Sequence, residues 1–219
     1  MDHESGQARS SLLLSFEKFT NLCFYKVKAK RRNVKRNFMT NYSYKENLES
    51  NRLITRFLKT SDISVWADFY ADEDAVEFFP NFGLKTNFEQ AKYMIDKQLD
   101  RYSNNLFGHQ ALIEKETNNF IGVCGLLTQE VDNIVEIEVG YHIFKKYWGK
   151  GFAPEAAKLF INYAFENELT DSVISIIDIG NVKSQKVAEK NGLMREKQTK
   201  YSDGEDVYIY RIINNKSSI

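Results

Sequence analysis

The chain contains little proline and little cysteine, with two of each among its 219 residues. This scarcity excludes collagen-like, proline-rich and disulfide-stapled architectures. Cys23 and Cys124 also lack the neighbouring cysteines and histidines that a zinc site requires, so we expect no metal centre. So few cysteines are typical of a protein from a reducing compartment, and we expect the chain to be cytoplasmic.

Long hydrophobic runs are also missing. Near the start of the chain, the longest aliphatic run covers residues 12–14. A signal peptide needs roughly 7–15 apolar residues and a membrane-spanning helix about 20. We therefore expect no insertion into a membrane. Hydrophobic residues nevertheless make up 42% of the sequence and aromatic residues 14%, which is enough for a folded domain with a sizeable core.

The net charge is zero because 30 basic residues balance 30 acidic ones, but the two signs are separated along the chain. Residues 1–38 carry nine basic and three acidic side chains, and the rest of the chain carries 21 and 27. The basic segment 26–36 has neither helical nor strand periodicity. We expect residues 1–50 to form a basic, poorly ordered extension, residues 51–213 a folded domain, and residues 214–219 a short tail.

Three interpretations of the basic extension remain open. The simplest, which we favour, is a solvated tail. The segment could also be an over-extended reading frame whose natural start is Met39. The third interpretation is an arm that contacts RNA or another anionic surface, because clustered lysine and arginine release counterions when they bind phosphates.

Strand and helix patterns alternate from residue 53 to residue 211 and predict one α/β domain. Three consecutive strands joined by short polar turns favour an antiparallel meander. Thr86 and Glu89 form a capping box that opens a helix, on which Phe88, Ala91, Tyr93, Ile95 and Leu99 are expected to face the core. The expected strands are 53–58, 107–114, 120–128, 134–143, 172–178, 193–201 and 206–211, and helices are expected after Ser61-Asp62, at 86–101, at 151–167 and after Asn181.

The junction between the 134–143 strand and the 151–167 helix carries the strongest functional signal. It reads Tyr147-Trp-Gly-Lys-Gly-Phe-Ala-Pro-Glu-Ala156, so two glycines stand one residue apart just before the helix. Glycine lets a backbone wrap closely around a ligand, and the N–H groups of a helix N-terminus favour an anion such as a diphosphate. A lone Gly-x-Gly is more often just a tight turn. The third glycine of a dinucleotide fold and the Gly-Lys-Ser/Thr of an NTPase loop are absent.

Three blocks together resemble the GNAT acyltransferase superfamily, and within it the ribosomal-protein N-terminal acetyltransferase (RimJ/RimL-like) branch. The blocks are residues 138–141, residues 147–156, and residues 181–184 with 189–192. Lys146 stands where the family usually has Gln or Arg. The resemblance implies the GNAT fold, with a mixed, largely antiparallel sheet of about six to seven strands flanked by about four helices.

The resemblance also implies the chemistry, which is acetyl transfer from acetyl-coenzyme A to a primary amine by direct attack in a ternary complex. The acceptor would be a protein or peptide N-terminus, slightly ahead of a small-molecule amine. The 134–143 strand would splay from its neighbour, the pantetheine would pair with its free edge, and a backbone N–H of residues 141–143 would stabilise the oxyanion. Cofactor contacts are implied for Tyr141, His142, Ile143, Lys146, Trp148, Gly149, Lys150, Gly151, Phe152, Ala153, Asn181 and Lys190.

Two side chains receive catalytic roles by the same resemblance. Glu138 matches the glutamate of the first block and is expected to act as the base, directly or through water. Glu136 is a competing assignment, and a carboxylate that only orders the sheet or attracts a cationic acceptor is an equal alternative for Glu138. Ser184 matches the serine thought to assist the departing thiolate, although a serine in a first helical turn is unremarkable. His142 is a weaker alternative base.

The aromatic segment 77–82 and the helix from Thr86 lie where this family builds its acceptor wall. Phe79 or Phe82 could line that wall, and Asp72, Glu73 and Asp74 could attract a cationic amine. A second class of function stays open, namely a non-catalytic module that binds acyl-coenzyme A or associates with RNA or the ribosome. A homodimer is compatible with either function.

Overall fold

The structure is a computed structural model that describes residues 43–201 and 204–214. The basic segment 26–36, Cys23, Met39 and most of the 214–219 tail lie outside the described residues. The three interpretations of the basic extension therefore stay predictions.

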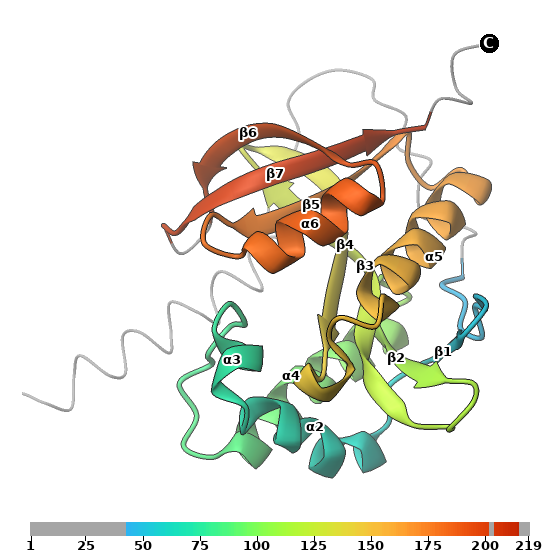
Figure 1. The fold of residues 1–219 in the computed structure, drawn as a ribbon, viewed down its shortest axis with the longest axis vertical. Helices are drawn as coiled ribbons and strands as arrows, with labels where there is room; N and C mark the ends of the chain where they lie inside the picture. Colours follow the sequence, from blue (N-terminus) through green and yellow to red (C-terminus); the bar gives the residue numbers. More distant parts are fainter. Residues whose placement is uncertain (1–42, 202–203, 215–219) are drawn as a thin grey trace, which may run out of the picture. The chain divides into compact units, whose positions relative to one another are not determined.

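A single seven-stranded sheet forms the centre of the described chain (Figure 1). Its strand order is β1-β2-β3-β4-β5-β7-β6, and all neighbours are antiparallel except β4 and β5. This sheet confirms the expected fold and its meander. The strands are β1 Leu53–Arg56, β2 His109–Glu114, β3 Phe120–Val131, β4 Ile134–Ile143, β5 Ser172–Asp178, β6 Met194–Lys200 and β7 Asp206–Ile213.

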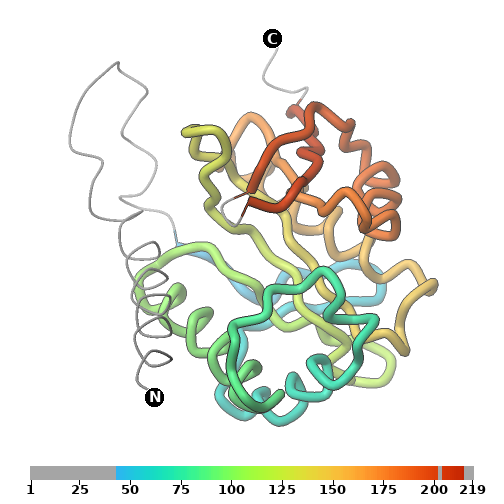
Figure 2. Tube along the Cα trace, turned by 90° about the vertical axis from the view of Figure 1, so that its left-hand side faces the viewer, coloured from blue at the N-terminus to red at the C-terminus, as the bar shows by residue number. Residues whose placement is uncertain are grey.

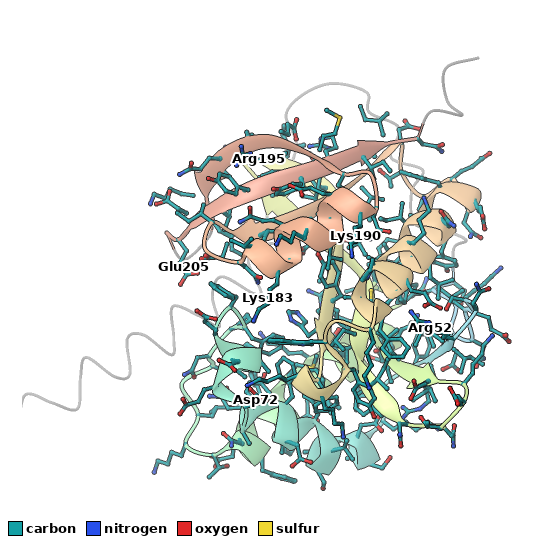
Figure 3. All side chains as sticks on the ribbon, in the orientation of Figure 1. Arg52, Asp72, Lys183, Lys190, Arg195 and Glu205 are labelled. Carbon is teal, nitrogen blue, oxygen red and sulfur yellow. The ribbon has the colours of Figure 1, made fainter. Side chains whose placement is uncertain are left out.

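Helices cover both faces of this sheet. Figure 2 shows α4 and α5 on opposite sides of β3 and β4, and Lys183 and Lys190 stand near the two ends of α6 (Figure 3). Within the described ranges, no helix is both long and apolar enough to cross a membrane. The helices are α2 Ile63–Tyr70, α3 Glu73–Val76, α4 Asn87–Ser103, α5 Phe152–Glu166 and α6 Val182–Lys190, with short 3-10 turns η1 Thr60–Asp62 and η2 Lys145–Tyr147.

The strand boundaries follow the sequence pattern closely. β4 and β5 begin and end where the pattern places them. β1 stops at Arg56, two residues early, because the chain there turns toward η1. β3 runs three residues further than expected and pairs with β4 up to a tight turn, in which Asp132 and Asn133 both have positive φ (50° and 64°).

The capping box of α4 is confirmed, but the predicted buried face of this helix is partly wrong. Thr86 Oγ1 accepts a hydrogen bond from Glu89 N at 3.2 Å, and the Glu89 carboxylate accepts one from Thr86 N at 3.0 Å. Phe88 and Tyr93, expected in the core, are 50% and 37% exposed. Two glutamines hold buried positions instead, because their amides bond to backbone groups: Gln90 accepts from Phe82 N and Gln98 from His109 N.

The starts of α2 and α6 differ from each other. Asn181 caps α6 as expected, since its Oδ1 accepts the Ser184 N–H at 3.0 Å. Asp62 precedes α2 but makes no side-chain cap. Its carboxylate instead accepts a hydrogen bond from Lys59 N at 2.8 Å and pairs with Arg56 at 2.7 Å, so it stabilises the turn before the helix.

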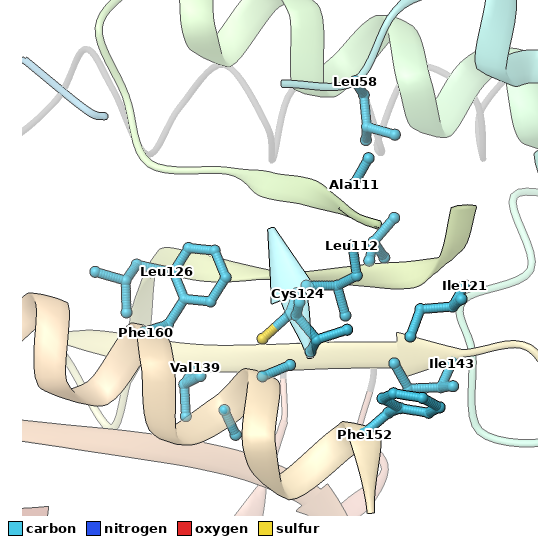
Figure 4. Packing of buried hydrophobic residues seen from close by; sticks show 14 of the residues in the cluster. Leu58, Ala111, Leu112, Ile121, Cys124, Leu126, Val139, Ile143, Phe152 and Phe160 are labelled. Atoms are coloured by element: carbon cyan, nitrogen blue, oxygen red, sulfur yellow. The ribbon is translucent and has the colours of Figure 1, made fainter. Parts of the chain in front are cut away.

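The core consists of buried side chains of the meander, of α5, and of α2 and α4. Figure 4 shows side chains of β2, β3 and β4 meeting those of α5. Leu112, Cys124 and Phe160 are fully buried, and Val139 and Phe152 are at most 3% exposed. Cys124 is a free thiol in this core.

The folded domain begins before residue 51, which corrects the predicted boundary. Tyr44 is only 6% exposed. Its hydroxyl donates to the carbonyl of Gly108 at 2.8 Å and accepts from Leu126 N at 3.3 Å, and its ring meets that of Phe107 edge-on at 5.2 Å. Residues 43–50 therefore belong to the domain, because Tyr44 fills part of its core.

We expect Tyr44→Ala to lower the free energy of unfolding by about 3–5 kcal/mol, as removal of a buried aromatic side chain usually does. Tyr44→Phe keeps the ring but leaves the carbonyl of Gly108 unpaired, so it should cost about 1–3 kcal/mol. Urea unfolding of both variants measures the two losses. Equal stability of the alanine variant and the unaltered chain would contradict the revised boundary.

Candidate active site

The parallel strands β4 and β5 separate immediately after they meet. Their one registered pair is Glu138 opposite Ile174. Beyond this pair, hydrogen bonds from side chains replace backbone hydrogen bonds between the two strands. Ser175 Oγ donates to the carbonyl of Val139 at 3.2 Å, and Glu138 Oε1 accepts from Ile176 N at 3.3 Å. Because no strand ladder continues, the edge of β4 that follows Val139 is open toward β5, as the resemblance implies.

Alternate residues of β4 direct their backbone groups to opposite edges. Phe144 N donates to β3, at the carbonyl of Ile121, whereas the carbonyls of Val139 and Ile143 accept from side chains on the other edge. By this alternation, the N–H groups of Tyr141 and Ile143 face the opening. The N–H of His142 faces β3, so it is not available to a ligand in the opening.

The Gly-x-Gly turn leads from β4 through η2 into α5. Gly149 and Gly151 have φ of 75° and 81°, in the left-handed region that favours glycine. Within the described chain, no N–H group of residues 149–153 donates a hydrogen bond of normal geometry to another residue. A Cβ added to Gly149 would meet no atom within 4 Å. The turn thus presents a row of unbonded amides, next to open space, at the N-terminus of a 15-residue helix.

Lysines surround this turn. Lys146 and Lys150 lie over the ring of Tyr147, with Nζ 5.3 and 5.2 Å from its centroid. Lys183, on the first turn of α6, lies 4.3 Å over the ring of Trp148. The Trp148 indole donates to the carbonyl of Ile143 at 2.7 Å. Lys183 was not expected at the site, although it lies within the 181–184 block.

The first turn of α6 is tied to β4 through Ser184. Its N–H donates to Asn181 Oδ1, and its carbonyl accepts from the Tyr141 hydroxyl at 3.0 Å. The two hydroxyl oxygens of Tyr141 and Ser184 lie 2.9 Å apart. Burial raises the pKa of Tyr141, so its phenol stays protonated at neutral pH. Three expected site residues therefore meet beside the opening between β4 and β5.

Glu138 is more deeply buried than expected, at 8% exposure. Its Oε2 accepts from Gln129 Nε2 at 2.6 Å, and Gln129 Oε1 in turn accepts from the Tyr201 hydroxyl at 3.1 Å. Burial raises the pKa of Glu138, although the bonds from Gln129 and Ile176 partly oppose this rise. The carboxyl group is thus held in a fixed position and is more basic than an exposed one.

The competing carboxylate, Glu136, is engaged elsewhere. It forms a two-pronged ion pair with Arg211, with distances of 2.7 and 3.1 Å, and Arg211 also bonds to Ser172 and Glu196. Both carboxylate oxygens of Glu136 are thus occupied by the guanidinium. The geometry therefore favours Glu138 over Glu136 as a base.

Two histidines lie on the same face of β4 as Glu138, since His142 follows Glu138 by four residues and His109 packs against Gly140. His109 is 8% exposed, and neither of its ring nitrogens has a hydrogen-bond partner within the described residues. The ring of His142 lies 5.4 Å from that of His109 and 4.3 Å from that of Phe79. Burial lowers the pKa of His142 to about 3 and the pKa of His109 well below its usual value. Both rings are therefore neutral at pH 7.

Both aromatic residues expected in the acceptor wall are half-buried and pack against the core. Phe79 packs edge-on against Phe69 at 5.2 Å, whereas Phe82 lies against Tyr93 at 4.7 Å. The acidic residues beside α3 line a surface hollow of about 430 Å³. Lys145 pairs with Asp74 and lies 3.8 Å from Asp72, so part of this acidic charge is neutralised. No cluster of potential metal ligands occurs in residues 43–201 and 204–214.

Comparison with known proteins agrees with this geometry. A family model described as an acetyltransferase (GNAT) domain matches residues 52–194. The uncharacterized N-acetyltransferase p20 of Bacillus licheniformis is 28% identical over 173 residues, which cover 77% of this chain and 96% of p20. The uncharacterized protein YkkB of Bacillus subtilis (strain 168) is 38% identical over 80 residues. This match covers 36% of this chain and 46% of YkkB.

Solved structures show the same fold. A GNAT-family acetyltransferase from Bacillus anthracis superimposes with a TM-score of 0.63 at 23% identity, covering 76% of this chain and 97% of that one. RimL, a ribosomal L7/L12 alpha-N-protein acetyltransferase in complex with coenzyme A, gives a TM-score of 0.61 at 16% identity, covering 75% and 95%. At these identities the likeness concerns the fold alone.

The open β4 edge and the amide-lined turn define the class of acyltransferases that bind an acyl-coenzyme A. The chain belongs to the GNAT acetyltransferase family. It is therefore an N-acetyltransferase with acetyl-coenzyme A as its acyl donor. This assignment favours the enzyme over the non-catalytic module that the sequence left open.

The two neutral histidines predict a loss of stability in mild acid. Their folded-state pKa values lie below the unfolded value of about 6.5, so the unfolded chain binds more protons as the pH falls below 6.5. Between pH 7.5 and 5.0, each histidine should cost about 2 kcal/mol of unfolding free energy. Urea unfolding at both pH values measures the loss. His142→Phe should remove about half of it, and an unchanged pH dependence would contradict the assignment.

Proposed function

We propose that this enzyme transfers the acetyl group to a primary amine by direct attack in a ternary complex, and that a protein or peptide N-terminus is the preferred acceptor, ahead of a small-molecule amine. The observation that carries the proposal is the row of unbonded amides at residues 149–153 beside the opened edge of β4. Such a pair of features suits a diphosphate joined to an extended chain.

The residues present suit coenzyme A in chemical character. The amides of residues 149–153 and the ammonium groups of Lys146 and Lys150 would bind the diphosphate. The N–H groups of Tyr141 and Ile143 would bond to the pantetheine and to the developing oxyanion. Bound acetyl-coenzyme A supplies an activated thioester. Further contacts would come from Trp148, Asn181 and Lys190, with His142 contributing only through its side chain.

Glu138 serves as the base in this proposal. A lysine-like amine with a pKa of about 10.4 costs roughly 4–5 kcal/mol to deprotonate at pH 7, whereas a peptide α-amine with a pKa of about 7.7–8.0 costs about 1 kcal/mol. The raised pKa and fixed carboxylate of Glu138 suit proton removal from the attacking amine, directly or through water. A base of this kind matters more for the alkylamine.

Ser184 donates a hydrogen bond to the departing sulfur in this proposal. A thiolate whose thiol pKa lies near 8.5 needs only a weak donor. The phenol of Tyr141 has one proton, which it can give either to the carbonyl or to the hydroxyl oxygen of Ser184. When it gives that proton to the hydroxyl oxygen, the proton of Ser184 is available to the sulfur.

The preference for a protein N-terminus is supported by RimL, which is named a ribosomal L7/L12 alpha-N-protein acetyltransferase, and by a relative named as a ribosomal N-acetyltransferase. The putative ribosomal N-acetyltransferase YdaF of Bacillus subtilis (strain 168) is 34% identical over 76 residues, 34% of this chain. The acidic residues beside α3 would attract the positive charge that an amine acceptor carries before deprotonation. A cytoplasmic location would supply both acetyl-coenzyme A and such acceptors.

The placement of the diphosphate predicts the effect of filling the turn. Gly149→Trp puts a large side chain against the amides of residues 149–153, so the dissociation constant for coenzyme A should rise at least about a hundredfold. Isothermal calorimetry measures it. Gly204→Trp is the matched control, because Gly204 also has positive φ (89°) and open space at its Cβ position. Unchanged affinity in Gly149→Trp would reject this placement.

The base role predicts a difference between acceptors. We expect Glu138→Gln to lower kcat/KM by about a hundredfold or more for alkylamines and by less than about tenfold for peptide α-amines, because the α-amine needs less help to deprotonate. Thiol release from acetyl-coenzyme A with a panel of amines measures both rates.

Glu136→Gln is the control for this experiment, since its carboxylate binds Arg211 and should affect stability rather than acceptor preference. Equal losses for both acceptor types in Glu138→Gln would argue against the base role. Release of no thiol with any amine by the unaltered chain would argue against the proposed function as a whole.

A further inference from the structure

Arg52 reaches the Gly-x-Gly turn from the segment before β1. Its Nη1 donates to the carbonyl of Lys150 at 2.9 Å, and its Nε donates to Glu155 Oε2 at 2.7 Å. The guanidinium carbon also lies 4.3 Å over the ring of Phe152. One side chain thus contacts the turn, the first residue of α5 and the acid in its first helical turn.

Glu155 is held by further bonds from the same segment. Its Oε1 accepts from Ser50 Oγ at 2.7 Å and from Arg52 N at 2.9 Å. Burial raises the pKa of Glu155, but the hydrogen bonds from Ser50 and Arg52 lower it below its usual value overall. The carboxylate therefore stays ionised at neutral pH.

Stability alone does not account for this cluster. The Arg52 side chain is 46% exposed, and an ion pair at such a position contributes little to stability. Its geometric effect is larger. The carbonyl and the following N–H of a trans peptide point in opposite directions. By holding the carbonyl of Lys150 on its own side, Arg52 directs the N–H of Gly151 to the other side of the turn.

The charge of Glu155 gives Arg52 a second effect. An ionised carboxylate in the first turn of α5 repels an anion that approaches the same amides. The guanidinium binds this carboxylate at 2.5 Å and neutralises it locally. The flanking glycines leave the turn free to rotate, so a fixed contact on its outer side decides which way its amides point.

We propose that Arg52 is a positioning residue for the cofactor: it orients the Gly151 amide toward the diphosphate and cancels the repulsion from Glu155. This inference rests on the proposed function, which puts the diphosphate of coenzyme A on residues 149–153. Arg52 and Lys150 are 98 residues apart in the sequence, and only the packing of the pre-β1 segment against α5 brings them together.

Calorimetry of coenzyme A binding to the full chain tests this inference. Arg52→Gln should raise the dissociation constant about tenfold or more, because it removes a charge-assisted bond and exposes the anion to Glu155. The KM for acetyl-coenzyme A should rise by a similar factor. Arg52→Gln combined with Glu155→Gln should regain part of the affinity, since the repulsion is gone while the carbonyl of Lys150 stays unbound.

Arg56 offers a matched control in the same strand region. Its guanidinium bonds to the carboxylate of Asp62 at 2.7 and 2.8 Å and to the carbonyl of Phe57 at 3.0 Å, and it lies over the ring of Phe120. Arg56→Gln therefore loses the same kinds of contact away from the turn. It should leave the dissociation constant for coenzyme A unchanged, even if its melting temperature falls.

Three results would overturn the role of Arg52: unchanged affinity in Arg52→Gln, an equal loss of affinity in Arg56→Gln, or a lower kcat in Arg52→Gln without weaker binding. Failure of this inference is distinct from failure of the proposed function. If Gly149→Trp abolishes binding while Arg52→Gln does not weaken it, the diphosphate lies on the turn and only the role of Arg52 is wrong. If Gly149→Trp has no effect, the proposed placement itself fails.

Discussion

The functional geometry depends on the early separation of β4 and β5. Two parallel strands would normally continue their ladder, but here Ser175 and Glu138 bond to the neighbouring backbone with their side chains. These side-chain hydrogen bonds satisfy the backbone polar groups next to the Glu138–Ile174 pair. The amides of Tyr141 and Ile143 remain directed at the opening. The binding of the acyl donor, the proposed base Glu138 and the proposed hydrogen-bond donor to the sulfur, Ser184, all depend on this opening. It brings the residues involved to one edge of the sheet.

The turn before α5 depends on support from outside the motif that defines it. Its glycines allow the left-handed conformation, and its amides remain unbonded within the described chain. Arg52 and Ser50 hold Glu155 and the carbonyl of Lys150 on the outer side. The conformation of this turn is thus supported by a segment far away in the sequence, because glycine alone permits many conformations and selects none.

Sequence patterns were sufficient where local physics decides the outcome. The capping box of Thr86 and Glu89, the Asn181 cap and the bounds of β4 and β5 all follow from local periodicity and hydrogen bonding, and the structure has them. The patterns failed where packing decides. Phe88 and Tyr93 look like core residues but are exposed, because amide side chains satisfy buried backbone groups instead. Tyr44 looks like part of a tail but is buried against residues that follow it by more than 60 positions.

By itself, the sequence determined the fold class, the family and the position of the glycine turn, since each depends on residues close together in the chain. Only the tertiary structure decided which polar groups meet. It bound Glu136 to Arg211, left Glu138 beside the opening with a raised pKa, and brought Tyr141 to Ser184. It also placed Arg52 against the turn. The physical reason is that hydrogen bonds and ion pairs act over a few ångströms in space, and chain separation carries no information about such contacts until the sheet and helices have packed.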